Sequence, residues 1–187
     1  MCEVKDKLSN LWLREATPDD MMLLFCWAND PVVRCGAFCT EEIAMADHRH
    51  WFRKVLSEEN IQIFILQRGD IPVGQVRIEA SGYEWNIDYS IDAAWRGNGY
   101  GRMILYLLEK MVANGTYLLG KVKFENIASQ KVFESLGYRK YVNEDNCIVE
   151  YRKCTFEHGG ETCLLAANTF IEEILPCLAI SRFREVA

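Results

Sequence analysis

A strand that runs into a glycine-rich turn and continues as a helix constrains this chain more than any other feature. Residues 84–92 alternate between apolar and polar side chains, as strands do, and residues 103–113 carry apolar side chains at helical spacing. Between them, residues 95–102 read Trp-Arg-Gly-Asn-Gly-Tyr-Gly-Arg. Gly99 and Gly101 let the backbone approach a ligand closely, and a helix start presents free N–H groups at the positive end of its dipole. The segment therefore predicts a site for a diphosphate-bearing cofactor.

Two common phosphate-binding motifs do not fit this segment. A Walker motif requires a Lys followed by Ser or Thr after its last glycine, and neither follows here. A dinucleotide-binding motif requires Gly-x-Gly-x-x-Gly after an early strand, whereas Gly97, Gly99 and Gly101 alternate and follow several expected strands. The pattern Arg96-x-x-Gly99-x-Gly101 instead resembles the acyl-CoA pyrophosphate loop of the Gcn5-related N-acetyltransferases (GNAT).

A second motif resembles a later segment of the same family. Residues 124–138 read Phe-Glu-Asn-Ile-Ala-Ser-Gln-Lys-Val-Phe-Glu-Ser-Leu-Gly-Tyr. In the family, an Asn and a Ser begin a helix that ends in Leu-Gly-aromatic. The two motifs occur in the family's order, and the resemblance covers residues 11–153. It implies an α+β acyl-CoA N-acyltransferase fold, a mixed central sheet of about 6–7 strands flanked by helices.

Local signals place the other elements. Thr17 and Pro18 are typical of a helix start, and Asp30-Pro31 is expected to end that first helix. The hairpin-rich first half fits an α+β sheet that splits around a cofactor. We expect helices over residues 17–29, 41–56, 103–113 and 128–136, and strands over residues 11–16, 61–67, 72–80, 84–92, 116–123, 139–143 and 147–153.

The length predicts one domain over residues 1–187. The resemblance implies that the core of this domain spans residues 11–153. After a break at Gly159-Gly160, residues 155–187 carry apolar side chains at helical spacing. This stripe indicates core packing or a contact between two subunits, so a homodimer is left open.

Charge and hydropathy exclude several kinds of partner. The chain has 21 basic and 27 acidic residues, and its net charge of −6 argues against nucleic acid as a partner. It has no apolar run of the roughly 18 residues that a membrane span requires, and residues 1–10 lack the apolar core of a signal peptide. We therefore expect a cytoplasmic protein with no membrane partner.

The cysteines and histidines do not predict a metal site. The eight cysteines contain no Cys-x-x-Cys pair, and His48, His50 and His158 form no ligand cluster with them. Reduced thiols in a reducing compartment are the expectation.

The resemblance implies acetyl-CoA as cosubstrate. In the family, the strand before the glycine loop binds the pantetheine arm through its backbone, and the loop and the later helix bind the rest of the molecule. The residues expected to contact acetyl-CoA are Tyr89, Ser90, Ile91, Arg96, Gly97, Asn98, Gly99, Tyr100, Gly101, Arg102, Asn126, Ser129 and Phe133.

Transfer of an acetyl group to an amine needs a base for the amine and a donor for the developing oxyanion. Glu125, at the end of an expected strand, is the predicted base, with Glu79, Asp88 or a chain of waters as alternatives. A backbone amide near Ser90 or Ile91 is the predicted oxyanion donor.

The leaving thiolate also needs a proton unless it departs as an anion. Many relatives place a tyrosine at the position of Phe133, which cannot donate one. Tyr138 or Tyr89 is then the expected acid, or the thiolate leaves unprotonated.

Three further segments suggest the acceptor. The chain carries Trp27-x-Asn29-Asp30-Pro31 followed by Arg34, then His48-x-x-Trp51, then Gly-Gln-Val-Arg ending at Arg77. Together they resemble the branch of the family that acetylates the 4-amino group of nucleotide-linked deoxysugars, as in pseudaminic acid synthesis. Aromatic rings suit a uracil or sugar face, and arginines suit a diphosphate. The expected acceptor-binding residues are Trp27, Asn29, Arg34, His48, Trp51 and Arg77.

Other interpretations remain open at this stage. Taken singly, each of these residues fits core packing or helix capping. A related branch acetylates protein N-termini, including ribosomal ones, and an antibiotic aminosugar is a third acceptor. The chain could also be a non-catalytic acyl-CoA-binding module.

Overall fold

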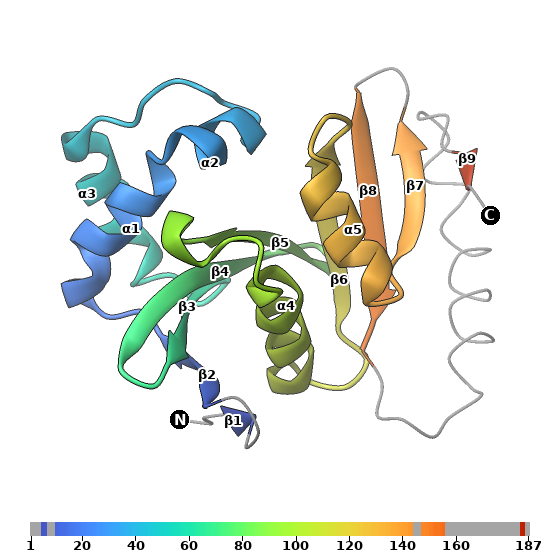
Figure 1. The fold of residues 1–187 in the computed structure, drawn as a ribbon, viewed down its shortest axis with the longest axis horizontal. Coiled ribbons are helices and arrows are strands. Elements are labelled where there is room, and N and C mark those ends of the chain that lie inside the picture. The colour runs from blue at the N-terminus through green and yellow to red at the C-terminus, as the bar shows by residue number, and fades with distance from the viewer. Residues whose placement is uncertain (1–4, 7–9, 144–146, 156–183, 186–187) are drawn as a thin grey trace.

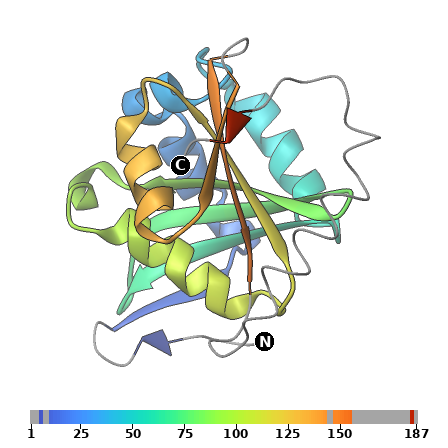
Figure 2. The ribbon, with the colours of Figure 1, turned by 90° about the vertical axis from the view of Figure 1, so that its right-hand side faces the viewer.

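A single twisted sheet runs through the molecule and carries helices on both faces (Figures 1 and 2). The computed structural model describes residues 5–6, 10–143, 147–155 and 184–185. The strands follow the spatial order β1-β2-β3-β4-β5-β6-β8-β7-β9. They are β1 (Lys5–Asp6), β2 (Leu11–Glu15), β3 (Ile61–Arg68), β4 (Ile71–Ser81), β5 (Glu84–Ile91), β6 (Tyr117–Lys123), β7 (Arg139–Asn143), β8 (Ile148–Cys154) and β9 (Arg184–Glu185).

Five α-helices and two short 3-10 helices accompany these strands in the described part of the chain. Figure 2 shows α4 and α5 on one side of the sheet and α3 on the other. The helices are α1 (Met21–Ala28), α2 (Pro31–Gly36), α3 (Met45–Val55), α4 (Tyr100–Met111) and α5 (Ile127–Ser135), with 3-10 helices η1 (Pro18–Asp20) and η2 (Ala93–Trp95).

Alternation along the strands produces a separate hydrophobic core on each face of the sheet. On β3, Phe64 and Leu66 pack with the buried side of α4, whereas Ile63 and Ile65 pack with α1 and α3. Successive side chains of a strand point to opposite faces, so a single apolar strand supplies both cores. The fold expected from the two motifs, a mixed sheet flanked by helices, is confirmed.

The sheet opens between β5 and β6. These two strands are parallel and pair at four positions, from Glu84 with Tyr117 to Ile87 with Gly120. Beyond Ile87, β5 continues to Ile91 while remaining paired with β4. The expected split of the sheet therefore begins after Ile87, where β5 stops pairing with β6. β5 is the strand that leads into the glycine loop.

Gly120 lies at the apex of this opening, and a larger residue does not fit there. A Cβ atom built on Gly120 would lie 2.6 Å from Cε1 of Phe133, whose ring is fully buried. We expect Gly120→Ala to lower the free energy of unfolding by about 2–3 kcal/mol, or roughly 4–12 °C in melting temperature. In Gly120→Ala/Phe133→Leu the loss should be smaller than the sum of the two single losses. Additive losses in thermal melts would show that the ring is not what excludes a side chain.

The first helical region differs from the expectation. Thr17, at the expected helix start, forms a capping box with Asp20, but the helix that follows ends at Ala28 and a new helix, α2, begins at Pro31. Asp30-Pro31 therefore ends one helix and starts the next, since the Asp30 carboxylate accepts hydrogen bonds from Val32 N and Val33 N.

The expected helical extension over residues 155–187 lies almost wholly outside the described residues. Among the helices that the structure describes, none has the length and apolar character that crossing a membrane would take.

Candidate active site

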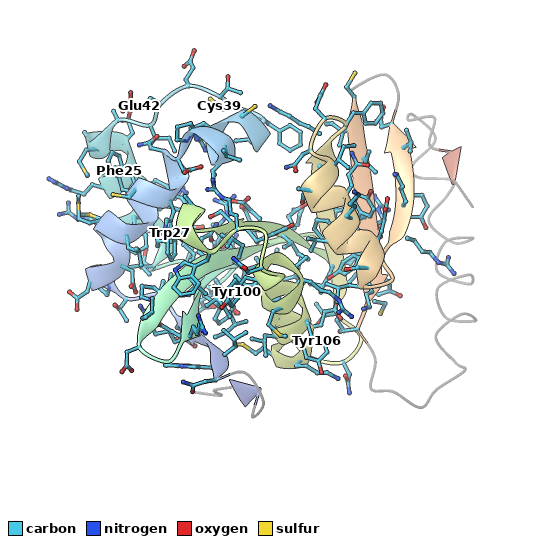
Figure 3. All side chains as sticks on the ribbon, viewed as in Figure 1. Phe25, Trp27, Cys39, Glu42, Tyr100 and Tyr106 are labelled. Atoms are coloured by element: carbon cyan, nitrogen blue, oxygen red, sulfur yellow. The ribbon has the colours of Figure 1, made fainter. Side chains whose placement is uncertain are left out.

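A cleft of about 950 Å³ follows the opening between β5 and β6. One part is lined by the helices α1, α2 and α3 together with β4, and the other by the start of α4, by β6 and by α5. We call the first part the acceptor half and its helices the acceptor-side helices, and the second part the cofactor half, after the ligands that the sequence suggested for each. Figure 3 labels three of the lining residues: Trp27 of α1, Tyr100 at the start of α4, and Cys39 on the segment after α2. The cleft therefore joins residues that the sequence had suggested for two different ligands.

The glycine loop, residues 95–102, turns at one end of this cleft and starts α4. Gly97 and Gly99 have φ values of 77° and 82°, in the left-handed region that favours glycine. The amides of Arg102 and Met103 both donate to the Gly99 carbonyl at 3.1 Å. The N–H groups of the two residues before them begin the helix without an intrahelical partner, as first-turn amides do. This arrangement suits an anion.

Two side chains expected to bind the cofactor form hydrogen bonds within the protein around the loop. Arg96 donates from Nε to the Ile91 carbonyl at 2.9 Å and from Nη2 to the Asp30 carboxylate at 2.7 Å. Asn98 donates from Nδ2 to the carbonyls of Trp95 and Arg96 at 3.2 and 3.0 Å. Both side chains therefore fix the shape of the backbone around the glycines.

The start of α5 faces the loop across the cleft. Asn126 caps this helix by accepting a hydrogen bond from Ser129 N, and the Tyr89 hydroxyl donates to Ser129 Oγ at 3.1 Å. Burial raises the pKa of Tyr89 to about 12, so its hydroxyl keeps its proton at neutral pH. Phe133 lies behind Tyr89, with ring centroids 6.0 Å apart in an edge-on contact. These four residues all line the cleft.

The three residues expected to act in catalysis are placed differently from one another. Ser90 lines the cleft, is 8% exposed and accepts a 3.4 Å hydrogen bond from Gln75. Glu125 is exposed and lies outside the residues that line the cleft. Tyr138 also lies outside them, and burial beside Glu109 holds the pKa of its hydroxyl well above the usual value. The cleft therefore contains one of the three.

Two acceptor-side residues have long-range structural partners. Trp27 is buried and donates from its indole nitrogen to the Asp92 carboxylate at 2.7 Å. The Asn29 side chain forms two hydrogen bonds with the Ile43 backbone, donating to its carbonyl at 2.9 Å and accepting from its amide at 2.8 Å. Both side chains thus hold the acceptor-side helices in place.

His48 and Arg34 also form hydrogen bonds with backbone carbonyls. His48 is buried with Nε2 3.1 Å from the Met21 carbonyl oxygen, and desolvation lowers the pKa of its imidazole. Arg34 donates from Nη1 to the carbonyls of Cys39 and Glu41, which shapes the segment after α2. Both side chains line the cleft. His48 Nε2 and Arg34 Nη1 have partners within the protein, whereas Arg34 Nε is buried without a hydrogen-bond partner among the described residues.

Trp51 and Arg77 are the two acceptor-side residues that meet in the cleft. The Arg77 guanidinium lies over the Trp51 ring, 5.6 Å from its centroid, and its Nη2 lies 3.7 Å from the Asp88 carboxylate. Arg77 belongs to a row of polar pairs across β4 and β5. The pairs are Gln75 with Ser90, Arg77 with Asp88, and Glu79 with Asn86, and all six residues line the cleft.

Sequence reasoning had singled out only part of this row. Glu79 and Asp88 were predicted as alternative bases, Gln75 was noted only as part of the Gly-Gln-Val-Arg motif, and Asn86 was not considered. The alternation of side chains along β4 and β5 could have predicted this row, because it places every second residue on the face of the sheet that α1 and α3 cover.

Comparison with known proteins identifies the family. The family model described as an acetyltransferase (GNAT) domain matches residues 10–139. A search of curated protein sequences found no match to the chain.

Solved structures share the fold. One is the spermidine N-acetyltransferase of Vibrio cholerae in complex with CoA and spermine, with a TM-score of 0.68, 14% identity and coverage of 79% of this chain and 96% of that one. Another is an aminoglycoside acetyltransferase in complex with coenzyme A, with a TM-score of 0.64, 18% identity and coverage of 77% and 94%. A third is a ribosomal L7/L12 α-N-protein acetyltransferase in complex with coenzyme A, with a TM-score of 0.63, 12% identity and coverage of 78% and 94%.

Proposed function

Because this chain belongs to the GNAT family of acetyltransferases, we propose that it acetylates the primary amine of an aminosugar, the 4-amino group of a nucleotide-linked deoxysugar in particular. It is an acetyl-CoA-dependent N-acetyltransferase, and acetyl-CoA is its cosubstrate. The acceptor and the roles of individual residues form the proposal.

The cofactor half of the cleft fits coenzyme A. The N–H groups at the start of α4 suit its diphosphate, and the strand from Tyr89 to Ile91 borders the opening where β6 no longer pairs with β5. Ser129 and Phe133 border the same opening from α5. In this arrangement the thioester carbonyl lies near the apex, and an amide of Ser90 or Ile91 donates to its oxygen as charge develops.

The base is a carboxylate of the polar row. Asp88 faces Arg77, whereas no ion pair engages Glu79 among the described residues. Glu79 therefore takes the proton from the attacking amine in our proposal, in place of Glu125, which lies outside the cleft. Tyr89, with its hydroxyl still protonated in the cleft, gives a proton to the departing thiolate.

The stacked pair of Trp51 and Arg77 is the observation that carries the acceptor assignment. A ring face beside a guanidinium suits a uracil or sugar ring joined to a diphosphate. The pair lies in the half of the cleft covered by α3. Neutral polar side chains next to it, Gln75, Ser90 and Asn86, offer hydrogen bonds to sugar hydroxyls.

Arg77→Gln tests this acceptor. We expect kcat/KM for a UDP-linked 4-amino-4,6-dideoxysugar to fall about tenfold, because a charged hydrogen bond to the diphosphate is lost. The same aminosugar without its nucleotide should lose much less, and Arg77→Lys should keep part of the activity. Thiol release from acetyl-CoA measures the rate of each enzyme with each sugar. An equal loss for both sugars would show that Arg77 does not contact the nucleotide.

A cationic amine is the second candidate, and the carboxylates of the cleft favour it. Asp47, Glu79 and Asp88 all line the acceptor half. Neighbours of the same fold are described with spermine and with aminoglycosides such as kanamycin. Spermidine, kanamycin and a peptide carrying a free N-terminus therefore belong beside the nucleotide sugar in the same assay. Release with one of these and none with the sugar would overturn the first proposal and keep the chemistry.

A further inference from the structure

The short helix α2 joins the two halves of the cleft. At its start, Asp30 Oδ1 accepts from Val32 N at 3.0 Å and from Val33 N at 3.1 Å, and the same oxygen accepts from Arg96 at 2.7 Å. At its end, Lys123 of β6 donates from Nζ to the Cys35 carbonyl at 3.0 Å. The acceptor-side helices are therefore attached directly to the cofactor half.

Arg96 is the centre of the first attachment. Its Nε bonds the carbonyl at the end of β5 and its Nη2 bonds Asp30, so both sides of the guanidinium are fixed. The next residue, Gly97, already has the positive φ of the loop. The side chains of Arg96 and Asp30 are only 29% and 20% exposed. A residue held on two sides at this point determines where the loop's N–H groups point.

A second link runs beside the first. Trp27 of α1 donates to one oxygen of Asp92, whose other oxygen accepts from Ala94 N at 2.9 Å and caps η2. The segment that leads from β5 into the glycine loop is thus held by α1 through Trp27 and by the start of α2 through Asp30.

We propose that Arg96 is a positioning residue for CoA binding, held by Asp30 from the acceptor-side helices, and not a ligand of the diphosphate. The proposal rests on the CoA site proposed above. The ion pair between Asp30 and Arg96 allows an electrostatic test of this proposal, because Asp30 places a negative charge beside a site proposed for an anion. If Arg96 were a ligand, removing that charge would free the guanidinium and strengthen CoA binding. If Arg96 positions the loop, the same change weakens binding.

Asp30→Asn separates these two cases. Asparagine caps a helix as well as aspartate does, so the bonds to Val32 N and Val33 N can persist while the ion pair is lost. We expect the Kd for CoA, measured by calorimetry well below the melting temperature, to rise about fivefold. Arg96→Gln should give a similar rise, and the double variant should bind no more weakly than either single one. The matched control is Asp19→Asn, an exposed residue with the same change of charge.

Three results would overturn the proposal. CoA bound as tightly or more tightly by Asp30→Asn, with weaker binding by Arg96→Gln, would make Arg96 a direct ligand. A lower melting temperature with an unchanged Kd would make the pair merely structural. If Asp30→Asn does not fold, Asp30→Ser, which also caps a helix, takes its place in the same comparison. Failure of the natural chain itself to bind CoA would remove the proposed cofactor site and this inference with it.

Discussion

Replacing Gly99 with proline is expected to abolish CoA binding in a domain that still folds. Gly99 has a φ of 82°, whereas proline fixes φ near −65° and has no N–H group. The loop would have to turn differently, and the amides at the start of α4 would no longer converge on one anion. Nothing lies within 4 Å of a Cβ built at this position, so the core is spared. Calorimetry should show a Kd for CoA at least about 100-fold higher, a loss of roughly 3 kcal/mol.

A pair of alanine variants provides the matched control. Gly115, in the turn after α4, has a φ of 85° and equally open surroundings, but it does not line the cleft. Gly99→Ala and Gly115→Ala therefore impose the same backbone strain, about 1–2 kcal/mol. We expect similar losses of melting temperature and weaker CoA binding in Gly99→Ala alone. Equal CoA affinities in the two variants would contradict the assignment of the loop.

Glu79→Gln is expected to lower kcat about 100-fold, the contribution typical of a general base. The substitution keeps the size and hydrogen-bonding atoms of the side chain while removing the group that accepts the proton. The KM for acetyl-CoA should change little, because Glu79 lies on the acceptor side of the cleft. Steady-state rates over a range of pH measure the effect. The loss should shrink at high pH, where more of the acceptor amine is already neutral.

Glu125→Gln and Asp88→Asn are the comparisons that identify the base. Glu125→Gln should retain most of the activity, because this side chain is exposed outside the cleft. Asp88→Asn removes the partner of Arg77 and should raise the KM for the acceptor more than it lowers kcat. A large loss of kcat in Glu125→Gln with little change in Glu79→Gln would restore Glu125 as the base.

The elements proposed to hold acetyl-CoA could be predicted because their signals are local. The glycine loop, its helix and the Asn126 cap of α5 each depend on residues within a few positions of one another. The structure has all three, although α4 spans Tyr100–Met111 where residues 103–113 were expected. The helix α2 was missed for a reason that is also local. Pro31 was interpreted as the end of a helix, whereas the Asp30 carboxylate before it can cap a new one.

Side-chain roles were much less predictable. Trp27, Asn29 and His48 were expected to bind the acceptor, yet their polar atoms bond Asp92, Ile43 and Met21. The motif in which they occur marks positions around the cleft, but a motif does not say which side chains already have partners. Those partners are 14 to 65 residues away in the chain.

The sequence by itself determined the fold, the family and the location of the glycine loop, because backbone conformation and strand alternation depend on neighbouring residues. Only the tertiary structure decided which polar groups line the cleft. The register between β4 and β5 brings Arg77 beside Asp88 and Glu79 beside Asn86, and the packing of α3 places Trp51 over Arg77. The same folding turns Glu125 away from the cleft and joins Arg96 to Asp30, across 66 residues. A base or an ion pair depends on distance in space, and that distance is fixed only when the sheet and helices have packed.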